Sequence, residues 1–241
     1  MSGQILAELR DGILHVSIER PEKRNALDEA MFSALADKLT DANEAANVAV
    51  VLIRGTADCF CAGHDRQLFG HLWPQPDNGV VARCMRAFLQ LDKPLVAAVC
   101  GAAHGFGATL LLSADYVVCG ENAVFAFPFA TLGIVPEAAA TTLLARRVGD
   151  LRARDWLLSG RTVQPQEALQ GGLVTHVVAN RFVFQEAERY AADLAQKPAG
   201  TLSRIRRLLR DGAARTPEAA LAAELAALNE LIPLLAASRP T

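Results

Sequence analysis

Two short segments, about forty residues apart, place small residues directly after an apolar run. The first, residues 60–65, reads Phe-Cys-Ala-Gly-His-Asp, and the second, residues 101–107, reads Gly-Ala-Ala-His-Gly-Phe-Gly. The preceding runs, 48–55 and 94–100, are typical of buried strands. Small residues at a strand end let a ligand approach the backbone closely. Two backbone N–H groups brought together from such turns stabilise a developing negative oxygen, so the pattern predicts an oxyanion hole.

The cysteine and histidine residues do not have the spacing of a metal site. The five cysteines are odd in number, and Cys59-x-Cys61 lacks the second ligand pair that a zinc site requires. The five histidines are scattered and form no spaced cluster with carboxylates. We therefore expect buried thiols, no disulfide framework and no metal.

Composition indicates an ordinary soluble protein. The chain has 241 residues, of which 51% are hydrophobic, and its formal net charge is -2. A near-neutral charge gives no reason to expect nucleic acid as a partner, and no apolar run approaches the roughly 18 residues of a membrane span. The first residues lack a secretory signal pattern, so a cytoplasmic location is the default expectation.

The elements that must position the two turns follow from the hydrophobic pattern. Asp11-Gly12 lies between two alternating segments and predicts a β-hairpin, and Asp28 is placed as the N-cap of a helix whose staple is Leu27 with Phe32. Further strands are expected at 48–53, 95–99, 115–118 and 123–127, and helices at 80–91 and 107–113.

This alternation predicts an α/β protein with parallel strands. After Pro136 helices are expected to dominate, interrupted only by a strand-like segment at 173–178. Nothing between the two halves has the composition of a linker. We therefore expect a single domain over residues 1–241, with an α/β core to about residue 195 and a C-terminal helical extension over about 196–241.

Six ordered motifs resemble the enoyl-CoA hydratase/isomerase family, the crotonase superfamily. They span almost the whole chain: 20–27, 60–65, 98–101, 127–136 with its Phe-Pro and Leu-Gly-x-x-Pro, Gly160 with Glu167-Ala168, and 172–174. The resemblance implies a crotonase-like stack of ββα units, a C-terminal trimerisation region, and a homotrimer or dimer of trimers. It also implies an acyl-CoA thioester as the substrate, with no separate cofactor.

The same resemblance assigns candidate site residues. The oxyanion donors correspond to the backbone N–H groups of His64 and Phe106, so their side chains are free to vary. The residues expected to border the substrate are Lys23, Arg24, Ala26, Ala62, Gly63, Asp65, Gly105, Gly107, Thr109, Pro128, Phe129 and Pro136. A solvated loop is a competing interpretation of Lys23 and Arg24, which the resemblance places near the CoA nucleotide.

The acid and base groups distinguish between reactions within the resemblance. Hydratases of this family use two carboxylates, and the corresponding positions here are Thr109 and Phe129, neither of which exchanges a proton at neutral pH. Glu137, after Pro136, instead looks like the catalytic base of the Δ3,Δ2-enoyl-CoA isomerase branch. A competing interpretation of Pro136-Glu137 is an ordinary helix start, with proline and an acid in the first turn.

The leading hypothesis is therefore an isomerase that shifts a double bond with one glutamate base. Enoyl-CoA hydratase-like activity and thioester hydrolysis on the same oxyanion hole are alternative enzymatic functions. A non-catalytic acyl-CoA-binding protein, which kept the fold after losing the hydratase acids, is the alternative outside the enzymes.

Overall fold

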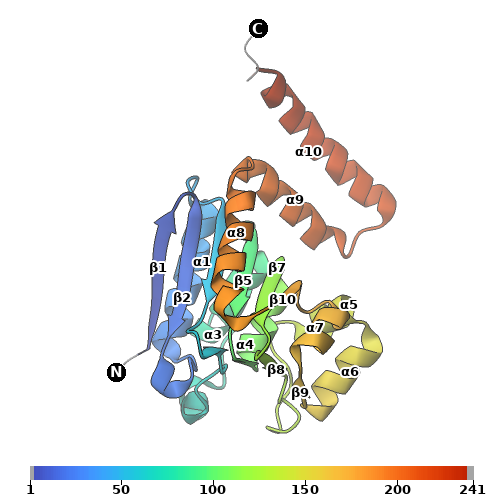
Figure 1. The fold of residues 1–241 in the computed structure, drawn as a ribbon. Coiled ribbons are helices and arrows are strands. Elements are labelled where there is room, and N and C mark those ends of the chain that lie inside the picture. The colour runs from blue at the N-terminus through green and yellow to red at the C-terminus, as the bar shows by residue number, and fades with distance from the viewer. Residues whose placement is uncertain (1–2, 238–241) are drawn as a thin grey trace.

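The computed structural model describes residues 3–237 and contains two β-sheets (Figure 1). The six-stranded sheet has the order β1 (Gln4–Arg10), β2 (Ile13–Glu19), β3 (Val50–Arg54), β5 (Leu95–Val99), β7 (Tyr116–Gly120), β10 (His176–Val178). The four-stranded sheet has the order β4 (Cys59–Cys61), β6 (Ala102–His104), β8 (Val124–Ala126), β9 (Thr162–Val163). Only β1 with β2 and β8 with β9 pair antiparallel; all other neighbours in these sheets are parallel.

The chain repeats one unit, in which one strand enters each sheet and a helix follows. The units are β3, β4 and α3 (Val80–Gln90), then β5, β6 and α4 (Phe106–Thr109), then β7, β8 and α5 (Ala140–Val148). Because β3, β5 and β7 are neighbours in the large sheet and β4, β6 and β8 in the small one, the units stack in register. The expected stack of ββα units is confirmed.

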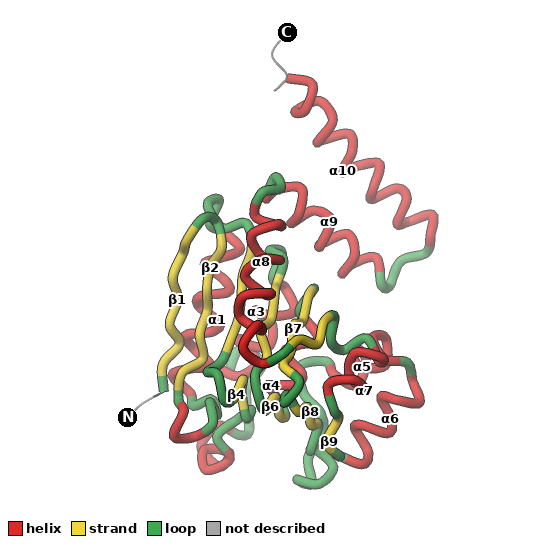
Figure 2. The backbone as a smooth tube through the Cα atoms, viewed as in Figure 1, coloured by secondary structure: helices red, strands yellow, loops and turns green. Residues whose placement is uncertain are grey.

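In the central strands of the large sheet, alternate side chains lie on two buried faces. Val50 and Leu52 pack with the helix α8 (Val183–Ala195), whereas Val51 and Ile53 face the core that contains α1 (Glu29–Glu44) and α3. Figure 2 shows α8 lying along the large sheet. A strand buried on both faces requires the continuous apolar run that marks 48–53 in the sequence.

The start of α1 confirms the capping prediction. The Asp28 side chain accepts a hydrogen bond from the Met31 N–H at 3.0 Å, and Leu27 and Phe32 are both fully buried. A cap of this kind contributes about 1 kcal/mol and fixes where the chain enters the helix.

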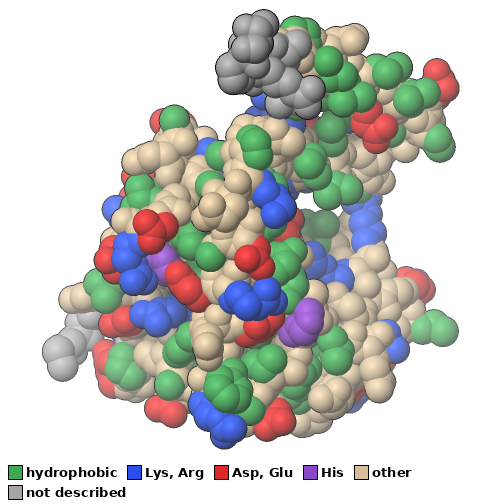
Figure 3. All heavy atoms as spheres, turned by 45° about the horizontal axis from the view of Figure 1, so that its top comes forward, with side chains coloured by type: hydrophobic (Ala, Val, Ile, Leu, Met, Phe, Trp, Pro, Cys, Tyr) green, Lys and Arg blue, Asp and Glu red, His purple; other side chains and the backbone are tan. Residues whose placement is uncertain are grey.

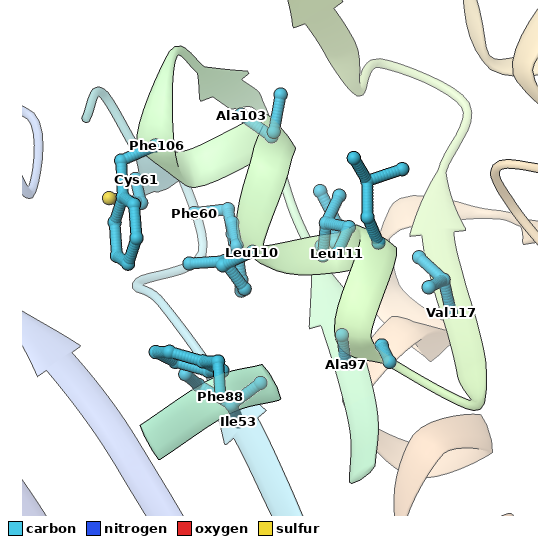
Figure 4. Packing of buried hydrophobic residues seen from close by; sticks show 14 of the residues in the cluster. Ile53, Phe60, Cys61, Phe88, Ala97, Ala103, Phe106, Leu110, Leu111 and Val117 are labelled. Carbon is cyan, nitrogen blue, oxygen red and sulfur yellow. The ribbon is translucent and has the colours of Figure 1, made fainter. Parts of the chain in front are cut away.

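The core beneath the short helix α4 is aromatic. The ring centroids of Phe106 and Phe88 lie 5.9 Å apart, and Figure 4 shows the sulfur of Cys61 beside the Phe106 ring. All five cysteines are free and buried, as predicted. This packing holds α4 against β4, and so holds one candidate oxyanion turn against the other.

Three short strands were not expected from the sequence. β6 lies within the second small-residue segment, β4 overlaps the start of the first, and β9 interrupts the mainly helical second half. Each spans only two or three residues, which is too short to show an alternating pattern.

The remaining short elements connect these units. They are η1 (Pro21–Lys23), η2 (Arg66–Leu68), α2 (Phe69–Leu72), η3 (Leu110–Ser113), α6 (Asp150–Ser159), α7 (Pro165–Gly171) and η4 (Asn180–Phe182). The helix expected at 107–113 is α4 followed by η3. Among residues 3–237, no helix is long and apolar enough to cross a membrane.

The C-terminal extension consists of α9 (Ala199–Gly212) and α10 (Pro217–Ala237); residues 238–241 lie outside the described residues. Arg206 joins α9 to the core, because its guanidinium donates to Asp115 Oδ2 at 2.6 Å and to the Ser113 carbonyl at 2.6 Å. Figure 1 shows α10 projecting away from the two sheets, and Figure 3 shows apolar side chains on this C-terminal part.

Asn25 joins the N-terminal loop to β4 and is fully buried. Its Nδ2 donates to the carbonyls of Cys59 at 2.7 Å and Phe60 at 3.2 Å, and its Oδ1 accepts from the Arg20 N–H at 2.8 Å. Its φ of 57° lies in the left-handed region, which asparagine tolerates better than most residues.

We predict that Asn25→Ala lowers the free energy of unfolding by about 2 to 4 kcal/mol, because it leaves buried backbone groups without partners. Urea denaturation followed by circular dichroism measures this change. The exposed Asn78→Ala is the matched control and should change stability by less than about 0.5 kcal/mol. An equal effect of the two substitutions would contradict the role given to Asn25.

Candidate active site

The two proposed oxyanion donors are free backbone groups. Within residues 3–237, neither the His64 N–H nor the Phe106 N–H donates a hydrogen bond to the protein. The two turns lie against each other: a Cβ atom placed on Gly63 would be 3.2 Å from the Phe106 nitrogen. The structure thus brings together the two segments that the sequence singled out.

Glycine is required at this contact. Gly63 has a φ of 87° and Gly105, which precedes α4, has a φ of 53°, both in the left-handed region. Gly107 touches the Cys61 carbonyl oxygen so closely that any side chain would overlap with it. These three positions allow the backbone of α4 to approach the backbone after β4.

The loop before α1 holds the first turn on its other side. Leu27 brackets it, because the Leu27 N–H donates to the Gly63 carbonyl at 2.7 Å and the Leu27 carbonyl accepts from the Asp65 N–H at 2.9 Å. The Ala62 N–H donates to the Arg24 carbonyl at 3.1 Å. Among the described residues, the N–H groups of Gly63 and Asp65 are thus paired, whereas the His64 N–H between them has no partner.

A buried ion pair holds the loop before α1 against this turn. Arg20 Nη1 lies 2.9 Å from Asp65 Oδ2 and 3.1 Å from the Ala26 carbonyl oxygen, and the side chains of Arg20 and Asp65 are only 12% and 8% exposed. Asp65 Oδ1 also accepts from the Gln67 N–H at 3.1 Å. The Asp65 side chain therefore stabilises the conformation of the turn. Its partner Arg20 is not among the site residues expected from the sequence.

The basic residues of the loop lie at the surface. Arg24 is exposed, with a φ of 53°, and Lys23 Nζ donates to Gln67 Oε1 at 2.7 Å. The Lys23 side chain thus contacts a residue that follows the first candidate turn, and the Arg24 side chain is exposed to solvent.

Glu137 lies close to Thr109 on α4. The Thr109 hydroxyl donates to Glu137 Oε1 at 2.6 Å, while Glu137 Oε2 is buried and has no hydrogen-bond partner among the described residues. Burial raises the pKa of Glu137 to about 7, against the opposing effect of the Thr109 hydrogen bond. A carboxyl group with this pKa can both accept and return a proton at neutral pH.

The backbone after Glu137 is a strained turn. The Ala140 N–H donates to the Glu137 carbonyl at 2.9 Å, and the two residues between them, Ala138 and Ala139, have φ values of 50° and 57°. Alanine in this region costs about 1 kcal/mol or more per residue. The competing interpretation of Pro136-Glu137 as a helix start is wrong, because α5 begins at Ala140 and the strained turn separates it from Glu137.

The loop that leads to Glu137 contains buried and partly buried apolar residues. Phe129 is buried and Pro128 and Pro136 are partly buried in the loop that leads to Glu137. Burial, with a smaller contribution from Glu137, raises the pKa values of the Cys61 and Cys84 thiols, that of Cys61 to about 12. Neither thiol is therefore a nucleophile at neutral pH.

Two features of the site do not follow from the sequence: the hydrogen bond of Thr109 and the conformation of the two alanines. Thr109 was expected only to border the substrate, whereas its hydroxyl donates to Glu137. Two consecutive alanines have no turn signal, so their left-handed conformation could not be expected. The geometry thus supplies two free N–H donors and one carboxyl group that titrates near neutrality.

Known proteins show the same sequence pattern and fold. The family described as enoyl-CoA hydratase/isomerase matches residues 8–234. The 2,3-dehydroadipyl-CoA hydratase of Escherichia coli (strain K12) is 34% identical over 236 residues, covering 98% of this chain and 91% of that protein. The 1,2-epoxyphenylacetyl-CoA isomerase of the same strain is 30% identical over 219 residues, covering 88% of this chain and 84% of that protein.

A solved structure of similar sequence also has a similar fold. The enoyl-CoA hydratase/isomerase from Pseudoalteromonas atlantica T6c superimposes with a TM-score of 0.83 at 34% identity, over 91% of this chain and 86% of that chain. With the family match, the two relatives and the stack of ββα units, the chain belongs to the enoyl-CoA hydratase/isomerase family.

Proposed function

We propose that this acyl-CoA enzyme moves a double bond from the Δ3 to the Δ2 position of an enoyl-CoA thioester. The observation that carries the proposal is the single carboxyl group of Glu137, which has a pKa of about 7 and a free Oε2. At the two positions where family hydratases have carboxylates, this chain has Thr109 and Phe129. Isomerisation needs only one group that takes a proton and returns it.

In the proposed reaction, the Glu137 carboxylate removes a proton from C2 of the acyl group. The electrons of that C–H bond move into a dienolate, and the negative charge on the thioester oxygen accepts hydrogen bonds from the His64 and Phe106 N–H groups. Protonated Glu137 then gives the proton to C4, which leaves the double bond between C2 and C3. One such N–H donor typically contributes about 2.7 to 4 kcal/mol to transition-state stabilisation.

Thr109 supports this reaction as a positioning residue. Its hydroxyl holds Oε1 of Glu137 and leaves Oε2 available for the substrate. Because the hydrogen bond favours the ionised carboxylate, it opposes the effect of burial on the pKa of Glu137. Hydration would require a second proton-exchanging group, and the Thr109 hydroxyl is already committed to Glu137.

The remaining contacts with the substrate follow from the position of the oxyanion turns. The CoA portion would lie along Lys23 and Arg24, beside the backbone of Ala26, and the thioester against Ala62, Gly63, Gly105 and Gly107. Lys23 is partly buried and Arg24 exposed, so both can meet phosphate groups at the surface.

We also propose that the enzyme is a homotrimer or a dimer of trimers assembled through its C-terminal region. The support is a row of apolar residues on α10: Leu221, Leu225, Leu228 and Ile232 are 47% to 56% exposed. Their spacing places them on one face of the helix, which has no cover within the described chain.

Glu137 is the proposed catalytic base. Glu137→Gln should lower kcat for conversion of 3-hexenoyl-CoA to the conjugated 2-enoyl product by about 100-fold or more, since the amide cannot accept the proton. Absorbance of the conjugated thioester follows the reaction, and the exposed Glu121→Gln is the matched control. Undiminished turnover in the Glu137 variant would refute its role. Release of free thiol by the native protein would instead support thioester hydrolysis.

The reaction rate should depend on the ionisation of Glu137. The rate should rise as pH increases through about 7, because only ionised Glu137 acts as the base. Thr109→Val removes a hydrogen bond that favours the carboxylate, so the pKa should rise further and the acid limb of kcat/KM should move up by about 1 to 2 pH units. Thr109→Ser keeps the hydroxyl and should keep the native limb. Superimposable pH profiles for all three proteins would contradict the positioning role.

The apolar face of α10 is the proposed contact between subunits. Leu225→Glu combined with Leu228→Glu should convert the oligomer to monomers, because two charges would have to be buried at the contact. Light scattering after size-exclusion chromatography measures the mass. Ala219→Glu, on a different face of α10, is the control and should leave the mass unchanged. A native protein that is already monomeric would refute the proposed assembly.

A further inference from the structure

The His64 side chain has an unexplained environment. Its ring centroid lies 4.5 Å from that of Phe32, 5.8 Å from that of Phe69 and 5.9 Å from that of Phe106. Both ring nitrogens are buried, and neither has a hydrogen-bond partner among the described residues. Burying a polar group without a partner costs about 1 to 3 kcal/mol, so a fold seldom keeps such a group unless something else binds it.

Apolar packing alone does not explain this residue. A phenyl or leucyl side chain would meet the three aromatic neighbours without the cost of two unpartnered nitrogens. Burial also lowers the pKa of His64 to about 4, so the ring is neutral at pH 7. A neutral imidazole offers one N–H donor and one lone-pair acceptor, which suits a ligand oxygen.

The His64 ring belongs to a residue of the proposed acyl-CoA site. The backbone N–H of the same residue is a proposed donor to the thioester oxygen. An acyl group bound there would therefore lie near the ring. Phe69, on the single-turn helix α2, is only partly buried and forms the outer wall of the aromatic cluster. Rotation of the Phe69 side chain would uncover the His64 ring nitrogens to a ligand bound beside this turn.

We propose that the preferred acyl group carries an oxygen substituent, a hydroxyl or a carboxylate, which hydrogen-bonds to the His64 side chain. This inference rests on acyl-CoA binding at the proposed site and not on the isomerisation itself. It makes the His64 side chain a specificity-determining group, in addition to the role of its backbone N–H.

Binding of thioesters without a double bond tests the inference separately from the reaction. Isothermal titration calorimetry compares 3-hydroxybutyryl-CoA with isovaleryl-CoA, which has a methyl group in place of the hydroxyl. It also compares glutaryl-CoA with hexanoyl-CoA, as a carboxylate against an apolar chain. The native protein should bind the oxygen-bearing member of at least one pair tenfold or more tightly.

The variant His64→Phe should abolish this preference while keeping the apolar member bound. His64→Gln, which retains a donor and an acceptor, should keep part of the preference. His176→Phe, on β10, is the matched control and should bind as the native protein does. Because phenylalanine removes two unpartnered buried nitrogens, H64F should melt at the same temperature as the native protein or higher, which shows that it folds.

Three results would overturn the inference: equal affinities within both pairs, a preference that survives in H64F, or no binding of any of the four thioesters. A preference that depends on His64 in a protein without isomerase activity would support the inference while refuting the proposed reaction. Isomerase activity together with equal affinities would do the opposite.

Discussion

The close backbone contact between the turn after β4 and the start of α4 is the constraint on which the rest of the structure depends. Gly63, Gly105 and Gly107 permit it, because a side chain at any of them would be strained or would collide with backbone. The buried Asn25 and the ion pair between Arg20 and Asp65 hold the N-terminal loop against β4 and the turn that follows it. The result is that the His64 and Phe106 N–H groups, which have no partner among the described residues, lie in adjoining turns.

The carboxyl group of Glu137 is balanced between two opposing effects. Burial favours its protonated form, and the hydrogen bond from Thr109 favours its ionised form, with a net pKa near 7. The left-handed pair Ala138 and Ala139 holds the backbone beside it at an energetic cost. Strain at such a position is common where a functional group must be held in place, and the surrounding fold compensates for it.

The architecture and the positions of the two turns could be predicted from the sequence, because they depend on local signals. Alternation, caps such as Asp28 and apolar runs such as 48–53 directly predict hairpin, helix and buried strand. The contacts between distant segments could not be predicted in this way. The bond from Thr109 to Glu137 joins residues 28 positions apart, and the left-handed alanines carry no turn residue that would reveal them. The resemblance therefore indicated which residues to examine, and the structure supplied their partners.

The central claim is that Glu137 exchanges a proton at C2 while two backbone N–H groups stabilise the thioester oxygen, and deuterium exchange tests it most directly. The native protein is incubated with 3-hexenoyl-CoA in heavy water, and the recovered thioester is analysed by mass spectrometry and NMR. We expect a shifted double bond that depends on Glu137, with deuterium at C2 and C4 introduced when protonated Glu137 exchanges its proton with heavy water before returning it. A thioester that binds and is recovered without deuterium at either carbon, and without a shifted double bond, would contradict the account and favour a non-catalytic acyl-CoA-binding protein.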